Sequence, residues 1–321
     1  MGKEFKGNER LGEERYNNQG DLMKIIVYIN SNNIIVEFQD EYRMKVHTTY
    51  QQFKNGSVSN IPSRLGEEKL NNQGCLMKII KYDNYNNIVV EFQDDYKAKI
   101  KTRYNEFSSG SIKNPYHKSV YGVGMVGEKY PIWINNTKVC KEYNAWKNML
   151  LRCFDNKAKE KHPEYKDVTC CNDWLLYENF YEWLHSQENF DKWLNGERWA
   201  VDKDILVKGN KVYSPENCCL VPNRINAMFT KSDSRRGDCP IGVHKYGSKY
   251  RASISVFNKN TNKKVNKHLG YYDNAESGFY YGYKPEKEKI IKQVAQEEYN
   301  EGNITKQCYE AMLNYKVEID D

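Results

Sequence analysis

Residues 23–38 read MKIIVYINSNNIIVEF, and this stretch decides how the first third of the chain folds. Residues 23–28 and 34–38 are short runs rich in β-branched and aromatic residues, which favour strands. Residues 30–33, between them, are asparagines and a serine, which are typical of turns. The stretch therefore predicts a β-hairpin.

The same pattern occurs twice in the chain. Residues 10–60 align without a gap with residues 64–114, and 32 of the 51 positions are identical. Strands joined by polar turns in so short a segment are typical of a small barrel-like module, which is marginally stable alone. We therefore expect two β-rich domains, residues 1–62 and 63–118, that act as adapters. A host protein is one expected partner of these repeats.

The repeats share aromatic residues that have two interpretations. They either pack in the core, which we favour, or stack on bases or on a peptide. The residues concerned are Tyr42, Tyr50 and Phe53 in the first copy and Tyr96, Tyr104 and Phe107 in the second.

The composition excludes several classes of protein. The chain has 321 residues, of which 39% are hydrophobic, and no run approaches the ~18 apolar residues of a membrane span. Aromatic residues make up 13%, which argues against global disorder. The first residues lack the apolar stretch of a secretory signal, so we expect a cytoplasmic protein whose nine cysteines are reduced.

The positive charge is concentrated late in the chain. The formal net charge is +6, but residues 231–284 alone contain 11 Lys or Arg and only 4 Asp or Glu. Such a local excess is typical either of a phosphate-binding surface or of an ordinary solvated face.

From residue 119 onward the apolar residues recur with a helical period. Two sets of apolar residues at this spacing, here called stripes, predict two helices, each with one apolar side that faces the core. The stripes are Tyr143, Trp146, Met149, Leu150 and Cys153, and then Trp174, Tyr177, Phe180, Trp183 and Leu184. Residues 199–226 then predict a strand, a turn, a second strand and a short helix.

Several spaced motifs in this segment carry a resemblance. They are W-x-x-M-x-x-R-C at residues 146–153, C-x-x-W at 171–174, and D-K-D, Y-S-P-E-N-C and V-P-x-x-x-N between residues 202 and 226. With these motifs the chain resembles the HNH-like proteins of phages and prophages, which are related to homing endonucleases. The resemblance implies a ββα-metal domain with flanking helices over residues 119–232. By position, Asp202 and Asn226 would be ligands of Mg²⁺ or Mn²⁺, and Asn217 would brace the loop.

Lys203 departs from the pattern of that family, because it occupies the place of the histidine base. A neutral imidazole with a pKa of about 6.5 accepts a proton at pH 7, whereas an unperturbed lysine, at about 10.4, is already protonated. Two alternatives follow. In the first, the protein is a hydrolase in which Lys203 contacts phosphate and a histidine elsewhere in the chain is the base. In the second, it is a DNA-binding scaffold that has lost catalysis. The histidines considered as substitutes are His162, His185 and His244.

The cysteines suggest a zinc site only weakly. Cys170–Cys171 and Cys218–Cys219 are adjacent pairs, whereas zinc knuckles use C-x₂₋₄-C so that both thiolates point inward. One cysteine of each pair with Cys153 and His162 is a conceivable set. We expect buried thiols and no structural zinc.

Residues 241–284 predict three strands and a helix. The motifs G-V at 242–243, Y-R-A-x-I at 250–254 and L-G-x-Y-D-x-x-E at 269–276 resemble the APETALA2-type DNA-binding domain. That resemblance implies a sheet that enters the major groove. The side chains expected to contact DNA are Arg251, Lys249, His244, Arg235 and Arg236. Gly278 and Gly282 stand where this family typically has alanine, which puts the packing of the helix in question.

Together these features predict a multi-domain α+β protein whose last domain spans residues 233–321. The favoured function is metal-dependent cleavage or nicking of double-stranded DNA. The alternative is a catalytically dead HNH-like scaffold that binds DNA or a host protein, as a regulator or an antagonist of host defence.

Overall fold

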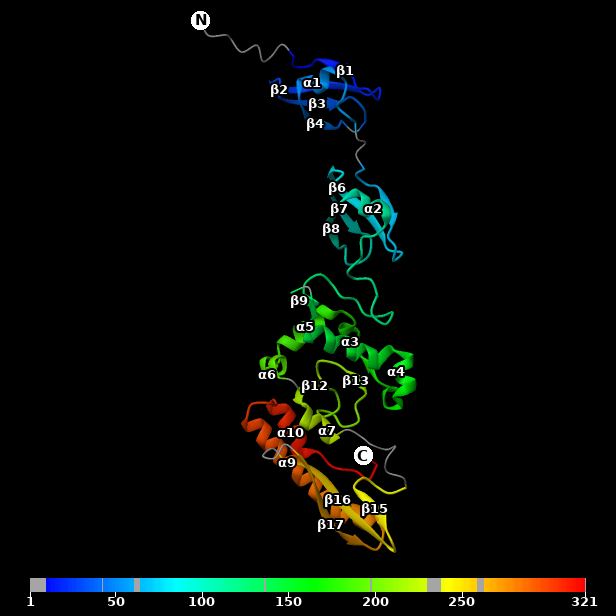
Figure 1. The fold of residues 1–321 in the computed structure, drawn as a ribbon, viewed down its shortest axis with the longest axis vertical. Helices are drawn as coiled ribbons and strands as arrows, with labels where there is room; N and C mark the ends of the chain where they lie inside the picture. The colour runs from blue at the N-terminus through cyan, green and yellow to red at the C-terminus, as the bar shows by residue number, and fades with distance from the viewer. Residues whose placement is uncertain are drawn as a thin grey trace. The chain divides into compact units, whose positions relative to one another are not determined.

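The computed structural model describes residues 10–41, 43–60, 64–135, 137–196, 198–229, 238–258 and 263–320. The chain divides into two compact units, Met1–Asn114 and Pro115–Asp321. The α+β prediction is confirmed, since the described residues form two four-stranded and one three-stranded antiparallel sheets together with helices (Figure 1). None of the described helices is both long enough and apolar enough to span a membrane.

The two repeats have the same fold, and each contains the predicted hairpin. In the first, the strands run in the order β1-β2-β3-β4, and a short helix follows β4. Its elements are β1 (Glu14–Tyr16), β2 (Leu22–Asn30), β3 (Asn33–Phe38), β4 (Lys45–Thr48) and α1 (Tyr50–Lys54). Those of the second are β5 (Glu68–Leu70), β6 (Leu76–Asn84), β7 (Asn87–Phe92), β8 (Lys99–Thr102) and α2 (Tyr104–Ser109).

The barrel-like description of the repeats is wrong. In the described part of each repeat the sheet is open, with β1 and β4, or β5 and β8, at its edges. These edge strands are three and four residues long, and within the described residues they do not pair with each other. The helix covers the core instead, because Phe53 of α1 and Phe107 of α2 are fully buried.

The shared aromatic residues divide into two groups. Phe53 and Phe107 confirm the core interpretation, whereas Tyr96 is exposed and Tyr42 lies outside the described residues. Tyr50 and Tyr104 are half-buried. The Tyr50 hydroxyl donates to Glu13 and the Arg10 guanidinium lies 4.0 Å from its ring centroid, and Tyr104 has the equivalent partners Glu67 and Arg64.

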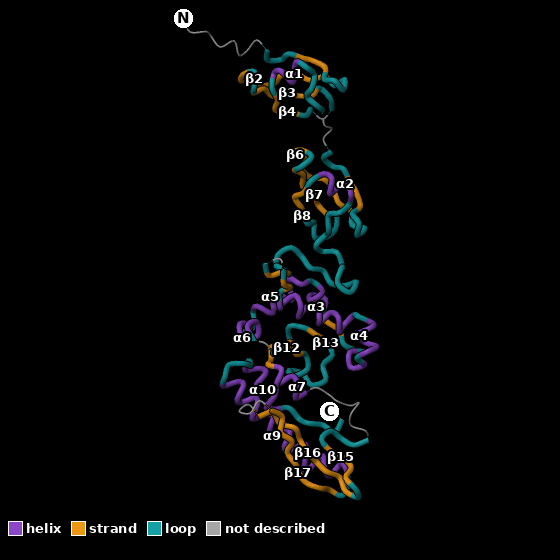
Figure 2. Tube along the Cα trace, viewed as in Figure 1, coloured by secondary structure: helices purple, strands orange, loops and turns teal. Residues whose placement is uncertain are grey.

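The first part of the second unit is helical (Figure 2), and its core is rich in aromatic residues. Its helices are α3 (Lys141–Phe154), α4 (Asn156–Lys161), α5 (Tyr177–His185) and α6 (Phe190–Asn195). Both predicted stripes are mostly core, since Trp146, Trp174 and Phe180 are at most 1% exposed, but Trp174 lies before α5, in the 3₁₀ helix Asn172–Leu175. The Trp146 indole N–H donates to the Trp174 carbonyl at 2.7 Å, which satisfies a polar group inside this core.

The predicted strand, turn, strand and helix follow. Strand β12 (Trp199–Asp202) pairs antiparallel with β14 (Cys219–Pro222), and Asp202 lies opposite Cys219. Helix α7 (Asn223–Phe229) begins directly after β14. Within the long loop between the paired strands, β13 (Val212–Tyr213) pairs in parallel with β11 (Thr169–Cys170).

The last part of the chain has the predicted three-stranded sheet, ordered β15-β16-β17, followed by helices. Its elements are β15 (Val243–Tyr246), β16 (Lys249–Asn258), β17 (Lys263–Tyr272), α8 (Ala275–Ser277), the π-helix η4 (Gly278–Tyr283), α9 (Lys284–Asn300) and α10 (Lys306–Asn314). Gly278 and Gly282 allow η4 to pack closely against the sheet. A Cβ on Gly282 would lie 2.8 Å from the Cβ of Ala252, so η4 lies closer to the sheet than alanine would allow.

Candidate functional site

The exposed face of β15–β17 is one candidate site. The strand register places His244, Arg251 and Tyr271 side by side in one row across the three strands. Tyr246 and Lys249 are paired in the adjacent row, and Ser253 is opposite His268. The alternate residues of β16, among them Ala252 and Ile254, are buried against the helices. Strand β16 therefore has one face toward the helices and one face away from them.

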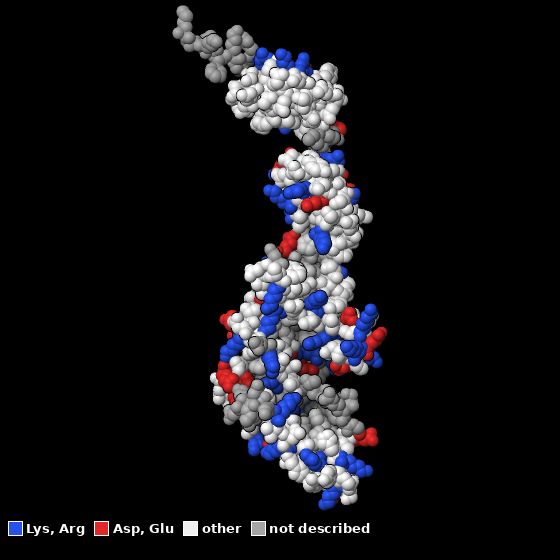
Figure 3. All heavy atoms as spheres, in the orientation of Figure 1, with Lys and Arg blue, Asp and Glu red and all other residues white. Residues whose placement is uncertain are grey.

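This face has aromatic and basic side chains, and the carboxylate of Asp273 lies beside Lys249 just after β17. The three strands contain six Lys or Arg residues and no Asp or Glu. Tyr246 and Tyr271 are exposed, with ring centroids 5.3 Å apart, and the His268 ring lies 4.7 Å from that of Tyr271. In the space-filling view, Lys and Arg predominate over β15–β17 (Figure 3). Such a surface is suited to a polyanion with stacked bases.

The structure places the predicted DNA-contacting residues as follows. Arg251 is half-buried, and its Nε atom is buried without a hydrogen-bond partner within the described residues. Lys249 is exposed and lies 3.6 Å from the exposed carboxylate of Asp273, a pair of little energetic consequence. His244 is exposed beside Arg251. Arg235 and Arg236 lie outside the described residues.

Asp202 lies in a second candidate site, where β12 ends and the long loop begins. Its side chain is 94% buried, and its Oδ1 atom accepts hydrogen bonds from the backbone N–H groups of Asp204 at 2.9 Å and Ile205 at 3.0 Å. Burial and the neighbouring Asp204 carboxyl raise the pKa of Asp202 to about 6. A cation bound beside Asp202 would favour its ionised form.

Lys203 contributes a cation to this site. Its ammonium group is 3.0 Å from the Asp204 carboxylate and 5.9 Å from the ring centroid of Tyr213. The side chain is 13% exposed. A lysine ammonium has three hydrogen-bond donors and no acceptor, and Lys203 is paired with the Asp204 carboxylate.

The other predicted site residues are placed around the loop. Asn217 donates to the side chain of Asn210 at 3.3 Å, and Asn210 in turn donates to the Lys203 carbonyl at 2.6 Å. Asn217 thus braces the loop through Asn210. Asn226 is half-buried on α7, the helix that follows β14.

The three histidines considered as alternative bases have other partners. His162 hydrogen-bonds with Glu164 at 3.1 Å, and His185 stacks against Tyr181 with 3.9 Å between ring centroids. His244 belongs to the sheet face. Within the described residues, none of these contacts joins a histidine to Asp202.

The donors around Asp202 fit a hard divalent cation. Mg²⁺ is usually held by one or two carboxylates, together with water and substrate phosphate, and Asp202 and Asp204 supply two. Among the residues that the structure describes, no group of three or more His, Cys, Asp or Glu side chains is placed to hold a metal. Any metal would therefore depend on water or phosphate for its remaining ligands.

Cys218 and Cys219 diverge into separate cores, whereas Cys170 and Cys171 are half-buried against the same core. Cys218 packs with the aromatic core around Trp146, whereas Cys219 packs with the core beneath the C-terminal sheet. Both are buried, as predicted. Burial raises the pKa of the Cys218 thiol, and Cys219 Sγ lies 3.9 Å from Cys308 Sγ.

Sequence reasoning missed three residues of this site. Asp204 supplies the second carboxyl, and its position two residues after Asp202 was the available signal. Tyr213 and Arg152 were treated only as motif positions. The Arg152 guanidinium donates to the Tyr213 hydroxyl at 2.8 Å across 61 residues of sequence, a contact that no local pattern reveals.

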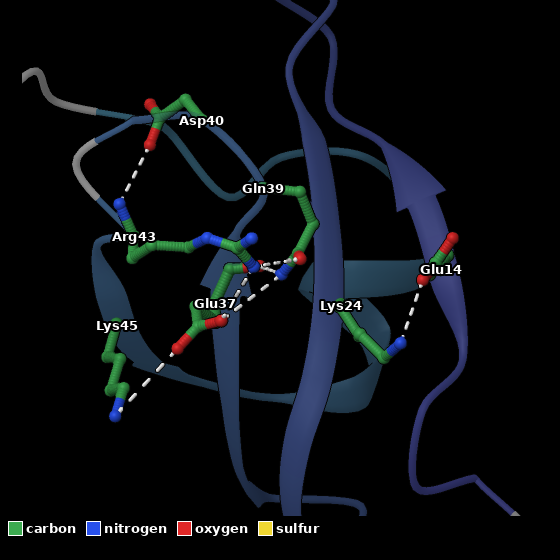
Figure 4. Close-up of polar contacts among 7 residues, drawn as sticks. All are labelled: Glu14, Lys24, Glu37, Gln39, Asp40, Arg43 and Lys45. Atoms are coloured by element: carbon green, nitrogen blue, oxygen red, sulfur yellow. Dashed lines mark hydrogen bonds and ion pairs between the residues drawn. The ribbon is translucent and has the colours of Figure 1, made fainter.

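The exposed sheet face of the repeats, by contrast, has internally matched charges. In the first repeat, the ammonium of Lys24 lies 3.0 Å from Glu14, and Glu37 lies 3.5 Å from Arg43 and 3.8 Å from Lys45 (Figure 4). The second repeat has the equivalent pairs Lys78–Glu68 at 2.9 Å and Lys99–Glu91 at 3.5 Å. These rows stabilise the sheets and do not by themselves indicate a ligand.

No family model matches the chain, and no curated protein or solved structure matches it either. Membership of the families that the motifs resemble therefore stays a prediction.

Proposed function

We propose that the protein binds double-stranded DNA through the exposed face of β15–β17 and nicks it, with Mg²⁺ or Mn²⁺, at the loop that begins with Asp202. The observation that carries the proposal is the sheet face, which presents Arg251 beside His244 and Tyr271 on three strands without an acidic residue.

DNA binding follows from the chemistry of that face. A small antiparallel sheet fits the major groove, where an arginine can donate two hydrogen bonds to guanine. The buried, unpartnered Nε of Arg251 supports a role in binding, because desolvating a guanidinium N–H without an acceptor is costly in the free protein. Lys249 and His244 would contact the phosphates around it. The resemblance to the APETALA2-type domain points to the same face.

Cleavage is proposed from the loop. Asp202 ends one strand of an antiparallel pair, and α7 with Asn226 follows the other strand, which is the ββα order that the HNH resemblance implies. Asp202, Asp204 and Asn226 would hold the divalent metal, which when bound polarises the scissile phosphate and stabilises the leaving oxygen. Lys203 would hold a phosphate oxygen as a point charge.

Substitution on the sheet tests DNA binding. Arg251→Ala and Lys249→Ala should each weaken binding to a duplex oligonucleotide, and Lys249→Ala should reduce the slope of log K against log salt concentration by about 1. Lys267→Ala is the matched control, because Lys267 lies on β17 but pairs with Glu286 of α9 at 2.8 Å. Equal binding by all three variants and the wild type would remove the sheet from the proposal.

Loss of catalysis is the second candidate, and a specific contact favours it. Lys203 forms an ion pair with Asp204 where a base is needed, and the histidines His162 and His185 are engaged elsewhere. The same scaffold would then bind DNA, or a host protein, without cutting.

Supercoiled plasmid distinguishes the two candidates. Incubation with Mg²⁺ or Mn²⁺ should give nicking by the wild type and none by Asp202→Ala if the protein is an endonuclease. Nicking only by Lys203→His would show a scaffold that retains the metal site but has lost the base.

A further inference from the structure

Arg152 is a cation whose position the proposed function leaves unexplained. It lies in the last turn of α3, and its guanidinium donates to the Tyr213 hydroxyl at 2.8 Å and lies 5.8 Å from the ring centroid of Tyr165. The side chain is half-buried, yet it forms no ion pair with a carboxylate within the described residues. Partly burying a charge without a counter-ion is unfavourable unless a ligand supplies one.

Tyr213 connects Arg152 to the Asp202 loop. The tyrosine ends β13, inside the loop between β12 and β14, and is 3% exposed. Its hydroxyl faces Arg152 and its ring lies 5.9 Å from the Lys203 ammonium. Burial raises the pKa of Tyr213 to about 12, so at neutral pH the hydroxyl is uncharged and does not neutralise Arg152.

The local charges therefore leave room for an anion. Arg152 contacts the Tyr213 hydroxyl and Lys203 lies 5.9 Å from the ring of the same tyrosine, and Asp204 forms an ion pair with Lys203. A guanidinium has five N–H donors, of which the Tyr213 hydroxyl uses one. The remaining donors form a fork that matches two oxygens of a phosphodiester.

We propose that Arg152 is a positioning residue that binds a backbone phosphate of the DNA beside the Asp202 loop, with Tyr213 orienting its guanidinium. The inference rests on the proposed DNA binding. It assigns this role to the arginine of the W-x-x-M-x-x-R-C motif, which lies on a helix remote in sequence from the loop.

The test compares two variants that break the same hydrogen bond. Arg152→Gln removes the charge and the fork, whereas Tyr213→Phe removes only the hydroxyl. Binding of the full-length protein to a labelled duplex oligonucleotide of mixed sequence is measured at several salt concentrations. Arg152→Gln should weaken binding roughly tenfold at low salt and reduce the salt slope by about 1. Tyr213→Phe should keep the wild-type slope.

Two results would overturn the inference: a wild-type salt slope in Arg152→Gln, or the same change in slope in both variants, which would identify Arg152 as a structural brace for Tyr213. Thermal unfolding of each variant checks the fold. If Arg152→Gln does not fold, Arg152→Lys replaces it. This variant keeps the charge but not the fork, so we expect a wild-type slope with about fivefold weaker binding, and unchanged affinity would contradict the proposal.

The same experiment separates this inference from the proposed function. A wild-type protein that does not bind the duplex overturns both. If the wild-type protein binds the duplex and Arg152→Gln shows the same salt dependence, only the proposed role of Arg152 is overturned.

Discussion

Asp202 is a buried carboxyl whose ionisation opposes folding. Its pKa is raised from 3.8 to about 6 by burial and by Asp204, so the folded protein holds this proton more tightly than the unfolded chain does. The contribution of Asp202 to stability is therefore greatest below pH ~4 and declines as the pH rises to about 6. The whole effect is at most about 3 kcal/mol.

Asp202→Asn should consequently stabilise the protein at pH 8. An amide oxygen can still accept the two backbone hydrogen bonds from Asp204 and Ile205, and the amide carries no charge. We expect the free energy of unfolding to rise by about 1–3 kcal/mol at pH 8 and to be nearly unchanged at pH 4. Urea unfolding at pH 4, 6 and 8 measures this difference.

Asp204→Asn is the matched control, because Asp204 is 40% exposed and acts on Asp202 mainly through its charge. It should reduce the pH dependence of stability without abolishing it. If Asp202→Asn were the less stable protein at pH 8, the folded state would favour the ionised Asp202 instead.

Single residues of the site differ in how far they could be predicted from sequence. Asp202 and Lys203 belong to a local motif, and the turn that Asp202 stabilises is local as well, so their positions followed from the sequence. The contact of Arg152 with Tyr213 depends on the packing of α3 against β11, with which β13 pairs. No periodicity encodes such a long-range contact.

Helix η4 depends on a close approach that a methyl group would prevent. Gly282→Ala places a Cβ 2.8 Å from Ala252 and 2.9 Å from the Tyr272 hydroxyl, so the helix must move away from the sheet. We expect a loss of about 1–3 kcal/mol in the free energy of unfolding. Gly278→Ala is the control, because its nearest neighbour, Val243, is 3.2 Å away and the helical propensity of alanine offsets the strain. Thermal unfolding of both variants measures their stabilities. A Gly278→Ala protein less stable than Gly282→Ala would contradict this prediction.

The two repeats differ at the beginning of their helices. In the first, Thr49 and Gln52 form a capping box at the start of α1, whereas Arg103, the equivalent residue before α2, makes no capping hydrogen bond. Arg103→Thr should restore the box, because Glu106 occupies the position of Gln52, and should stabilise α2 by about 1 kcal/mol. Slower hydrogen exchange over residues 104–109 in the full chain would report it.

The reciprocal change tests the same mechanism from the other side. Thr49→Arg should accelerate hydrogen exchange in α1, because it removes the existing capping hydrogen bond. Faster exchange in α2 of Arg103→Thr would show that Arg103 stabilises the helix by another route.

At this scale the sequence predicted the type of each element better than the closure of the sheets. The hairpins followed from two β-rich runs around a turn, and the helices of the middle segment from their apolar stripes. Whether a sheet closes depends on the lengths and positions of its edge strands. The three-residue strands β1 and β5 have no signal of that kind in the sequence.

Over the whole of the second unit, the Asp202 loop and the sheet are joined by one core. Ile205, Val221 and Ile225 pack in the same cluster as Phe279 and Ile291, which lie beneath the sheet. A buried ion pair reinforces it: Arg224 of α7 donates to Glu298 of α9 at 2.9 Å, and Glu298 is 3% exposed. The predicted boundary at residue 232 thus lies between segments that share their interior, so the sheet and the loop should unfold together.

Arg224→Met tests this coupling, because it removes the guanidinium that lies 2.9 Å from the buried Glu298 carboxylate. Removing one partner of such a pair should cost about 3–5 kcal/mol. If the core is shared, hydrogen exchange should accelerate together in β12, β14 and β15–β17. Glu297→Gln is the control: Glu297 contacts the same arginine at 2.7 Å but is half exposed, so its loss should cost less than about 1 kcal/mol. Faster hydrogen exchange confined to α7 and α9 would instead mean that the sheet is stable without the loop. DNA bound to the sheet would then not be held at a fixed distance from Asp202.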